Sequence, residues 1–312
     1  MNVQLAHPRG FCAGVDRAIE IVRRALEIHG APVWVLHEIV HNRTVLTELE
    51  ERGAVFVEDL EAIPSGSVTI LSAHGVAPAI EERARERQLH VIDATCPLVK
   101  KVHGEARSYT ASGDTLLVIG HPGHPEVLGT LGNVDGPAFV IATVEDARRV
   151  DVPTPTRVSF VTQTTLSVDD TAEIITVLRE RFPDLRGPDA EDICYATQNR
   201  QNAVKALLPN IDVLLVIGST NSSNSNRLAE LAQQHGKIAH LLEGPEDLGS
   251  IELASTTRVG ITAGASAPEH RVQALVRALQ ERGLCDEAVE VVTTEESTRF
   301  RLPAELDEVR AS

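Results

Sequence analysis

The stretch Val68-Thr-Ile-Leu-Ser-Ala-His-Gly75 decides the fold, because its pattern occurs three times along the 312-residue chain. An apolar strand is followed by a short polar loop and then by a segment with the apolar spacing of a helix. The pattern returns at Val158-Ser-Phe-Val-Thr-Gln-Thr-Thr165 and at Val259-Gly-Ile-Thr-Ala-Gly-Ala-Ser266. The expected helices are 77–88, 167–182 and 268–283. Such recurrence is the signature of a repeated architecture.

A second strand–loop–helix unit precedes each of these stretches. Its strands are expected at 33–36, 116–119 and 214–217, and its helices at 44–52, just after Glu126, and at 228–234. A strand and a short acidic helix then lie between the two units of each repeat. The three acidic segments are Val57-Glu-Asp-Leu60, Val144-Glu-Asp-Ala147 and Pro245-Glu-Asp-Leu248.

Strands that alternate with helices form mainly parallel sheets. The sequence therefore predicts an α/β fold of three pseudo-repeated lobes. The predicted lobes are 1–96, 97–193 and 194–293, and a C-terminal tail covers 294–312.

Composition excludes several classes of protein. A formal net charge of −16 argues against general nucleic-acid binding, which needs a cationic surface, although an anionic small molecule can still bind in a locally positive pocket. The longest apolar runs are strand-sized and far below the ~20 residues of a membrane helix. Residues 1–9 contain no apolar signal segment. We therefore expect a cytoplasmic protein that does not associate with membranes.

Three of the four cysteines fall at equivalent places. Cys12, Cys96 and Cys194 each open an expected helix, and they are separated by 84 and 98 residues, about one repeat. No two cysteines form a CxxC pair, and a reducing compartment disfavours a disulfide framework. Cys285 instead precedes an expected strand at 288–292, so we assign it a structural role.

A cysteine at a helix N-terminus has its thiolate favoured by the helix dipole. Three such thiolates, brought together by three related lobes, would form a soft site suited to zinc or to an iron–sulfur cluster. Structural zinc usually has four ligands, often supplied as CxxC pairs, whereas a cubane cluster on three cysteines leaves one iron open. The alternative is that all three cysteines are structural.

Polar residues also collect in the loops that follow the expected strands. They are His41, His74, His124, Glu126, Thr164, Thr165, Ser222, Ser223, Asn224 and Ser266. Glu126 is the candidate acid, with His124 and Thr164 or Thr165 placed to position a hydroxyl or relay protons. The others, with backbone N–H groups at helix starts, suit a diphosphate. Each has a simpler interpretation as a helix cap, a turn residue or a surface residue.

The remaining histidines are expected to be ordinary. His37-Glu38-Ile39-Val40-His41 matches the zinc-protease motif H-E-x-x-H, but that motif needs a helix, and this segment continues an expected strand. We expect the other histidines to be surface or loop residues. They are His7, His29, His90, His103, His121, His235, His240 and His270.

Nine motifs, in order along the chain, resemble those of the 4-hydroxy-3-methylbut-2-enyl diphosphate reductases, the LytB/IspH family, and the resemblance runs from about residue 3 to residue 268. They are Pro8–Gly14, His37–Asn42, Ser72–Gly75, Asp93–Pro97, Gly120–Glu126, Thr162–Ser167, Ile193–Thr197, Ser219–Arg227 and Thr262–Pro268. The departures are local. Pro122 stands where the family often has another residue, and the stretch after Asp286 is not distinctive.

The resemblance implies a central [4Fe–4S] cluster, one per chain, on Cys12, Cys96 and Cys194, with one iron not bound by protein. The substrate's hydroxyl would bind at that iron and leave as water with two electrons and protons. An allyl intermediate would then be protonated at either end, giving isopentenyl and dimethylallyl diphosphate in the last step of the methylerythritol phosphate pathway.

The resemblance also assigns roles to the loop residues and implies a partner. Glu126 would be the proton donor, assisted by His124, Thr164 and Thr165. The residues implied at the diphosphate are His41, His74, His124, Ser222, Ser223, Asn224 and Ser266. The electron donor would be a protein such as ferredoxin or flavodoxin.

Two alternatives from other classes remain open. One is a zinc-dependent hydrolase of a phosphorylated small molecule, using His and Glu ligands from the same loops. The other is a non-catalytic nucleotide or phosphate sensor with inert cysteines. The chain lacks a P-loop pattern and a convincing G-x-G-x-x-G after a strand, which argues against the sensor.

Overall fold

The computed structural model describes residues 2–153, 157–188, 192–254 and 257–307. The chain divides into two compact units. Unit one consists of Met1–Asp16, Val40–Glu48 and Tyr195–Arg299, and unit two consists of Arg17–Ile39, Leu49–Cys194 and Phe300–Ser312. Residues 308–312 of the predicted tail lie outside the described residues.

The helices agree closely with the expected pattern. They are α1 (Ala13–His29), α2 (Arg43–Glu50), α3 (Pro78–Glu86), α4 (Pro97–Ala111), α5 (Pro125–Gly132), α6 (Val144–Arg149), α7 (Val168–Arg181), α8 (Tyr195–Leu207), α9 (Ser223–Gln234), α10 (Glu269–Glu281) and α11 (Ala304–Asp307). Short 3₁₀ turns lie at Leu60–Ala62, Leu208–Asn210 and Pro245–Ser250. Among the described residues, every helix is too short or too polar to cross a bilayer.

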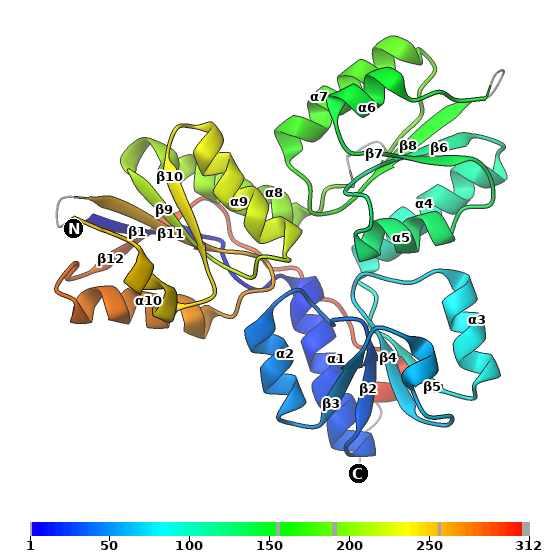
Figure 1. Ribbon diagram of the computed structural model, residues 1–312, viewed down its shortest axis with the longest axis horizontal. Coiled ribbons are helices and arrows are strands. Elements are labelled where there is room, and N and C mark those ends of the chain that lie inside the picture. The colour runs from blue at the N-terminus through cyan, green and yellow to red at the C-terminus, as the bar shows by residue number, and fades with distance from the viewer. Residues whose placement is uncertain (1, 154–156, 189–191, 255–256, 308–312) are drawn as a thin grey trace. The chain divides into compact units, whose positions relative to one another are not determined.

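Sheet A belongs to unit one and is parallel throughout. Its strands, in spatial order, are β10 (Ile238–Leu242), β9 (Val213–Ile217), β11 (Arg258–Ala263), β1 (Asn2–His7) and β12 (Ala288–Val292). Every residue of β9 is buried, as expected for a parallel strand covered on both faces. In Figure 1, α10 covers one face of the sheet, and α8 and α9 cover the other.

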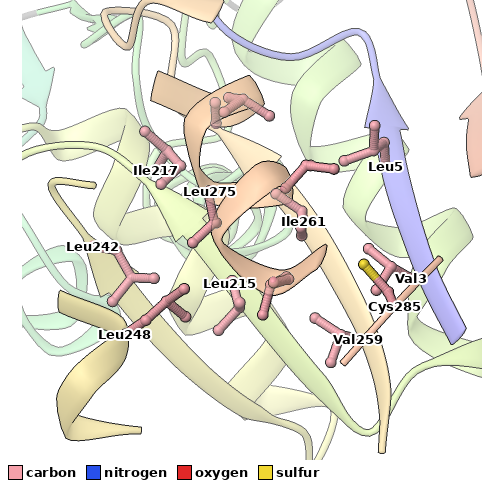
Figure 2. Packing of buried hydrophobic residues seen from close by; sticks show 14 of the residues in the cluster. Val3, Leu5, Leu215, Ile217, Leu242, Leu248, Val259, Ile261, Leu275 and Cys285 are labelled. Atoms are coloured by element: carbon pink, nitrogen blue, oxygen red, sulfur yellow. The ribbon is translucent and has the colours of Figure 1, made fainter. Parts of the chain in front are cut away.

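Alternate residues of β9 serve these two faces. Leu215 and Ile217 pack with Leu275 of α10, whereas Leu214 and Val216 belong to the core formed with α8 and α9. Figure 2 shows Cys285 in the first of these cores, with its sulfur beside Val3. This burial agrees with the structural role expected for Cys285.

Sheets B and C belong to unit two, and both are parallel. Sheet B has the order β3 (Ala54–Val57), β2 (Val33–Leu36), β4 (Val68–Leu71), β5 (His90–Asp93), and sheet C the order β7 (Ala138–Ile141), β6 (Thr115–Ile119), β8 (Val158–Thr162). Helix α4 packs on one face of sheet C with α5, and α6 and α7 pack on the other face. The predicted α/β class with parallel sheets is confirmed.

The repeat is visible in the order of the strands. The same spatial trio occurs as β3-β2-β4, β7-β6-β8 and β10-β9-β11. A further segment pairs beside each trio. Strand β5 pairs with β4, β1 pairs with β11, and Arg186 forms an isolated parallel bridge with Ser159 of β8. A cysteine opens a helix soon after each of these three segments. The lobe boundaries 1–96, 97–193 and 194–293 stay predictions, and β1, in the first of them, pairs in sheet A.

Two expectations need correction. Helix α9 begins at Ser223, five residues before the expected start at 228, so Ser223 and Asn224 lie in its first turn and not in a loop. Ser and Asn have low helix propensity, but Ser222 caps the helix by accepting the N–H of Ser225 over 3.3 Å. His103 is not a surface residue, since only 6% of it is exposed.

His103 takes part in a buried polar contact in unit two, between helices that pack on sheet C and the loop that follows β4 of sheet B. The Asn133 amide lies 3.2 Å from His103 Nδ1 and donates to the carbonyls of Gly129 and Val76 over 2.8 and 3.2 Å. Burial lowers the pKa of His103 to about 4, with the nearby Arg107 charge acting in the same direction. His103 is therefore neutral at physiological pH, and the contact joins α4 and α5 to the loop after β4.

The backbone of α5 also lies very close to the loop after β4 at this contact. A Cβ added to Gly132, the last residue of α5, would lie 2.2 Å from the Cβ of Ala77. A Cβ added to Gly104 on α4 would meet nothing within 4 Å. We expect Gly132→Ala to lower the free energy of unfolding by about 1–3 kcal/mol. The matched Gly104→Ala should raise it by about 0.5–1 kcal/mol. Urea titration of both variants tests this contrast, and equal midpoints would contradict it.

Candidate functional site

Two of the predicted cysteine ligands lie in unit two, each tied to a polar loop. The N–H of Cys96 donates to the carbonyl of Ala73 over 3.0 Å, and α4 begins at the next residue. The N–H of Cys194 donates to the carbonyl of Thr164 over 3.0 Å, and α8 begins directly after Cys194. The backbone therefore joins each cysteine to a loop that carries other predicted site residues.

Glu126 is the most distinctive residue of unit two. It lies in the first turn of α5 and is only 3% exposed. One carboxylate oxygen accepts the backbone N–H of Thr164 over 2.7 Å, and the other accepts its hydroxyl over 2.9 Å. Thr164, and not Thr165, is thus the residue that holds Glu126.

This setting changes the acidity of the carboxyl group. Burial raises the pKa of Glu126 to about 7, while the two hydrogen bonds from Thr164 lower it and the charge of Asp192 raises it further. A carboxyl group with this pKa is partly protonated at neutral pH. Glu126 can therefore donate a proton under physiological conditions, which an ordinary surface glutamate rarely does.

Two histidines lie close to the start of α5. His124 is the N-cap of α5, and its Nδ1 accepts the N–H of Glu126 over 3.2 Å. This bond leaves Nε2 of a neutral His124 as the protonated nitrogen. The ring of His74 lies edge-on to that of His124, with centroids 5.9 Å apart, and Ser72 lies 3.4 Å from His74 Nδ1. The structure thus brings the predicted residues His74, His124, Glu126 and Thr164 together.

Gln163 was missed by the sequence analysis, although it lies within the motif Thr162–Ser167. It is 2% exposed and joins the loops after β6 and β8. Its Oε1 accepts the N–H of His121 over 2.9 Å, and its Nε2 donates to the hydroxyl of Thr165 over 2.9 Å. Gln163 therefore fixes the position of Thr165 relative to the loop that leads to His124.

Asp192 is a second residue that the sequence analysis missed. Its side chain is fully buried, and it accepts a hydrogen bond from Lys101 Nζ over 2.8 Å. Its other oxygen accepts the N–H of Thr162 over 3.3 Å. In the sequence, the only indication that Asp192 lies near the site was its position two residues before Cys194. Lys101 compensates a buried charge that would otherwise be costly to hold near Glu126.

Cys12 lies in unit one, in the loop between β1 and α1. Its N–H donates to the carbonyl of Ala265 over 3.2 Å. Burial raises the pKa of the Cys12 thiol, while the charge of Arg200 and the N–H groups of Val15 and Gly14 lower it. The latter groups belong to the helix start and act in the predicted direction, but they do not outweigh burial, so the pKa of the Cys12 thiol stays above its ordinary value.

The predicted diphosphate residues of unit one already have hydrogen-bond partners within the chain. The hydroxyl of Ser266 donates to the carbonyl of His41 over 2.9 Å, and Asn224 Oδ1 accepts the N–H of Ala265 over 2.8 Å. Ser222 and Ser223 lie at the start of α9, where Ser222 acts as the cap. The helix-cap interpretation is thus observed for Ser222, and it uses the same N–H groups that an anion would use.

The residues of the apparent zinc-protease motif, His37–His41, do not form a helix. Residues 37–42 are irregular, and α2 begins only at Arg43. His37 has a backbone φ of +62° and its Nδ1 lies 2.8 Å from Glu58. The absence of a helix at residues 37–42 was predicted. The motif therefore cannot place its two histidines on one face of a helix.

Comparison with known proteins places this chain in a family. A family model described as LytB protein matches residues 3–280. The 4-hydroxy-3-methylbut-2-enyl diphosphate reductase of Saccharophagus degradans is 53% identical over 310 residues, covering 98% of this chain and 99% of that protein. Reductase 2 of the same name from Burkholderia mallei is 52% identical over 307 residues, covering 98% of this chain and 94% of that protein.

A solved structure gives the same result. The E-1-hydroxy-2-methyl-but-2-enyl-4-diphosphate reductase from Plasmodium falciparum is 36% identical, with a TM-score of 0.95, and the match covers 99% of this chain and 97% of that one. The sequence comparisons and the structural comparison thus match this chain to the same family over nearly its whole length. The chain belongs to the LytB protein family.

Proposed function

We propose that this chain is a 4-hydroxy-3-methylbut-2-enyl diphosphate reductase. It would remove the allylic hydroxyl of its substrate as water and yield isopentenyl and dimethylallyl diphosphate. The observation that carries the proposal is Glu126, a buried acid with a pKa of about 7 between a capping histidine and Thr164. Its relatives bear the name of this activity over nearly their full length. The alternative of a zinc-dependent hydrolase has no support among these relatives.

LytB-family reductases are iron–sulfur enzymes, and the donor set of this chain fits such a group. Cys12, Cys96 and Cys194 form no disulfide, none is fully buried, and each directly precedes a helix. They would hold one [4Fe–4S] cluster per chain, with one iron left without a protein ligand. When bound, the cluster supplies electrons and an open Lewis-acid position for the substrate's hydroxyl.

The chain's own residues would manage the protons. Loss of a hydroxide from carbon needs an acid, and Glu126 is protonated at neutral pH often enough to serve. Thr164 would hold the carboxyl group in place through its N–H and its hydroxyl. His124, whose Nδ1 faces the backbone, would present its Nε2 proton to the substrate, and Thr165 is held by Gln163 close by.

The diphosphate would be bound without a cluster of Lys or Arg. We assign it to His41, His74, His124, Ser222, Ser223, Asn224 and Ser266. Helix starts support this, since α5 begins directly after His124 and α9 begins at Ser223, and the positive end of a helix dipole attracts an anion. We propose that the enzyme acts in the cytoplasm and receives its electrons from ferredoxin or flavodoxin.

Purification without oxygen, followed by visible spectroscopy and by assays of iron, sulfide and zinc, tests the proposal. We expect a brown protein with about four irons and four sulfides per chain. It should convert 4-hydroxy-3-methylbut-2-enyl diphosphate to both products when a reduced dye supplies electrons. A reconstituted protein that holds no iron, or that holds zinc and hydrolyses the phosphate, would contradict it.

The acidity of Glu126 predicts the pH dependence of turnover. The protonated carboxyl group is the active form, and its fraction falls about tenfold per pH unit above the pKa of about 7. We therefore expect kcat/KM to decline as pH rises from 7 to 9. Thr164→Val removes a hydrogen bond that lowers this pKa, so its decline should begin at higher pH. Profiles that are flat to pH 9 in both proteins would contradict this role of Glu126.

A further inference from the structure

The guanidinium of Arg200 lies against the loop that carries Cys12 in unit one. Arg200 belongs to α8, and its side chain is completely buried. Its Nε and Nη2 donate to the carbonyl of Gly10 over 3.0 and 2.7 Å, and Nη2 also donates to the carbonyl of Phe11 over 3.1 Å. These are the last two backbone carbonyls before Cys12. The Arg200 side chain therefore binds the backbone carbonyl groups of the loop.

The N–H groups of the same loop are bound from β11 and the residues that follow it. Gly10 donates to the carbonyl of Ala263 over 3.2 Å, and Cys12 donates to the carbonyl of Ala265 over 3.2 Å. A loop whose N–H and carbonyl groups are both bound has little freedom to move. Arg200 thus binds the carbonyl groups of the loop, and the residues of and after β11 bind its N–H groups.

A buried guanidinium needs a negative partner, and the partner comes from a distant part of the sequence. Glu296 accepts hydrogen bonds from Nη1 over 3.0 and 3.3 Å and from Nη2 over 3.3 Å. Asn199 Nδ2 donates to the same carboxylate over 3.0 Å. The Glu296 side chain is 15% exposed, whereas Glu295 beside it is 79% exposed. Glu296 is therefore an inward-facing residue in a mostly exposed segment after β12.

We infer that Arg200 and Glu296 are a positioning pair for Cys12, acting on its loop through the carbonyls of Gly10 and Phe11. The inference rests on the proposed role of Cys12 as a ligand of the cluster. Neither residue touches the cluster in this proposal. Arginine is required because its planar fork reaches two carbonyls and a carboxylate at once, which the single ammonium of lysine does not do.

Glu296→Ala tests the pair in the full-length chain, with Glu295→Gln as the matched control. In metal-free protein kept without oxygen, we expect Glu296→Ala to raise the rate of Cys12 alkylation by iodoacetamide on the order of tenfold, because local opening of the loop becomes easier. Cys96 and Cys194, which lie in unit two, should keep their rates and serve as internal controls. Hydrogen exchange in residues 8–14 should speed up in parallel. Glu295→Gln should leave both measurements within about twofold of the parent.

Further variants and the iron content separate this inference from the proposed function. Arg200→Lys, which keeps the charge but not the fork, should behave like Glu296→Ala, and the cluster of both variants should lose iron to a chelator faster than that of the parent. Unchanged alkylation and exchange in both variants would overturn the positioning role and leave the proposed function standing. A parent chain that never binds iron would instead contradict the proposed function, while the alkylation rates would still decide the role of the pair.

Discussion

Glu126→Gln is expected to lower turnover by about 100- to 10,000-fold while the cluster content and the fold stay intact. Glutamine keeps the shape of the side chain and can accept the N–H of Thr164, but its amide N–H is far too weak an acid to protonate a leaving hydroxyl. Single-turnover measurements with excess substrate should show slow loss of the hydroxyl with near-normal binding. Turnover within a few-fold of the parent would remove Glu126 from the role of proton donor.

The same substitution should make the protein more stable at high pH. The pKa of Glu126 in the folded chain, about 7, lies above its ordinary value of 4.5, so folding favours the protonated form. Its contribution to stability is fully present below about pH 4.5 and is lost as pH rises through 7. Above pH 7 the buried carboxylate costs on the order of 3 kcal/mol, which glutamine avoids.

Urea titration at two pH values measures this cost. At pH 8.5 we expect Glu126→Gln to unfold with a free energy about 1–3 kcal/mol larger than that of the parent, and at pH 5 we expect the difference to shrink strongly. A stability difference that does not change with pH would show that the carboxyl group is not buried as described. A gain in stability together with a loss of turnover would mark Glu126 as a residue kept for chemistry at the expense of stability.

Cys96→Ser is expected to abolish loading of the cluster, whereas Cys285→Ser should leave it unchanged. Cys96 directly precedes α4 and is joined through its N–H to the loop of His74. A serine hydroxyl is a poor ligand for iron compared with a thiolate, and a cluster with two cysteine ligands is not held. Cys285 packs in the core of sheet A beside Val3 and belongs to no predicted ligand set (Figure 2).

Iron and sulfide per chain after anaerobic reconstitution provide the measurement. We expect about four irons in the parent and in Cys285→Ser, and close to none in Cys96→Ser. Full iron content in Cys96→Ser would remove Cys96 from the ligands. Cys285→Ser is expected to cost only some stability, because it buries a hydroxyl among apolar side chains.

The local parts of the fold could be predicted from the sequence. The strands of all three repeats and the helices after the cysteines follow from apolar runs of strand length and from helical spacing, which depend only on neighbouring residues. Helix α9 was placed five residues too late because Ser and Asn disfavour a helix interior, whereas a capped first turn tolerates them. Glu126 and Thr164 could be predicted to lie together because equivalent loops of a repeat end at the same edge of their sheets, and the structure joins them by two hydrogen bonds.

Contacts between distant residues could not be predicted in the same way. The pairing of β1 with β11 and β12 joins residues more than 250 positions apart, and no local pattern encodes it. The stretch after Asp286 looked undistinguished, yet Glu296 balances the buried charge of Arg200. His103 looked like a surface residue because its polarity gave no sign of its contact with Asn133.

The place of β1 in sheet A also sets an order of events during synthesis. Sheets B and C are built from residues 33–162, so all their strands are available early. Strand β1 must wait for β11 and β12, and at 5–20 residues per second that delay is roughly 15–60 s. Until then the loop of Cys12 lacks the carbonyls of Ala263 and Ala265 and the carboxylate of Glu296. We therefore expect ribosome-bound chains that end before residue 258 to expose Cys12, and the proposed cluster would be inserted only after that point.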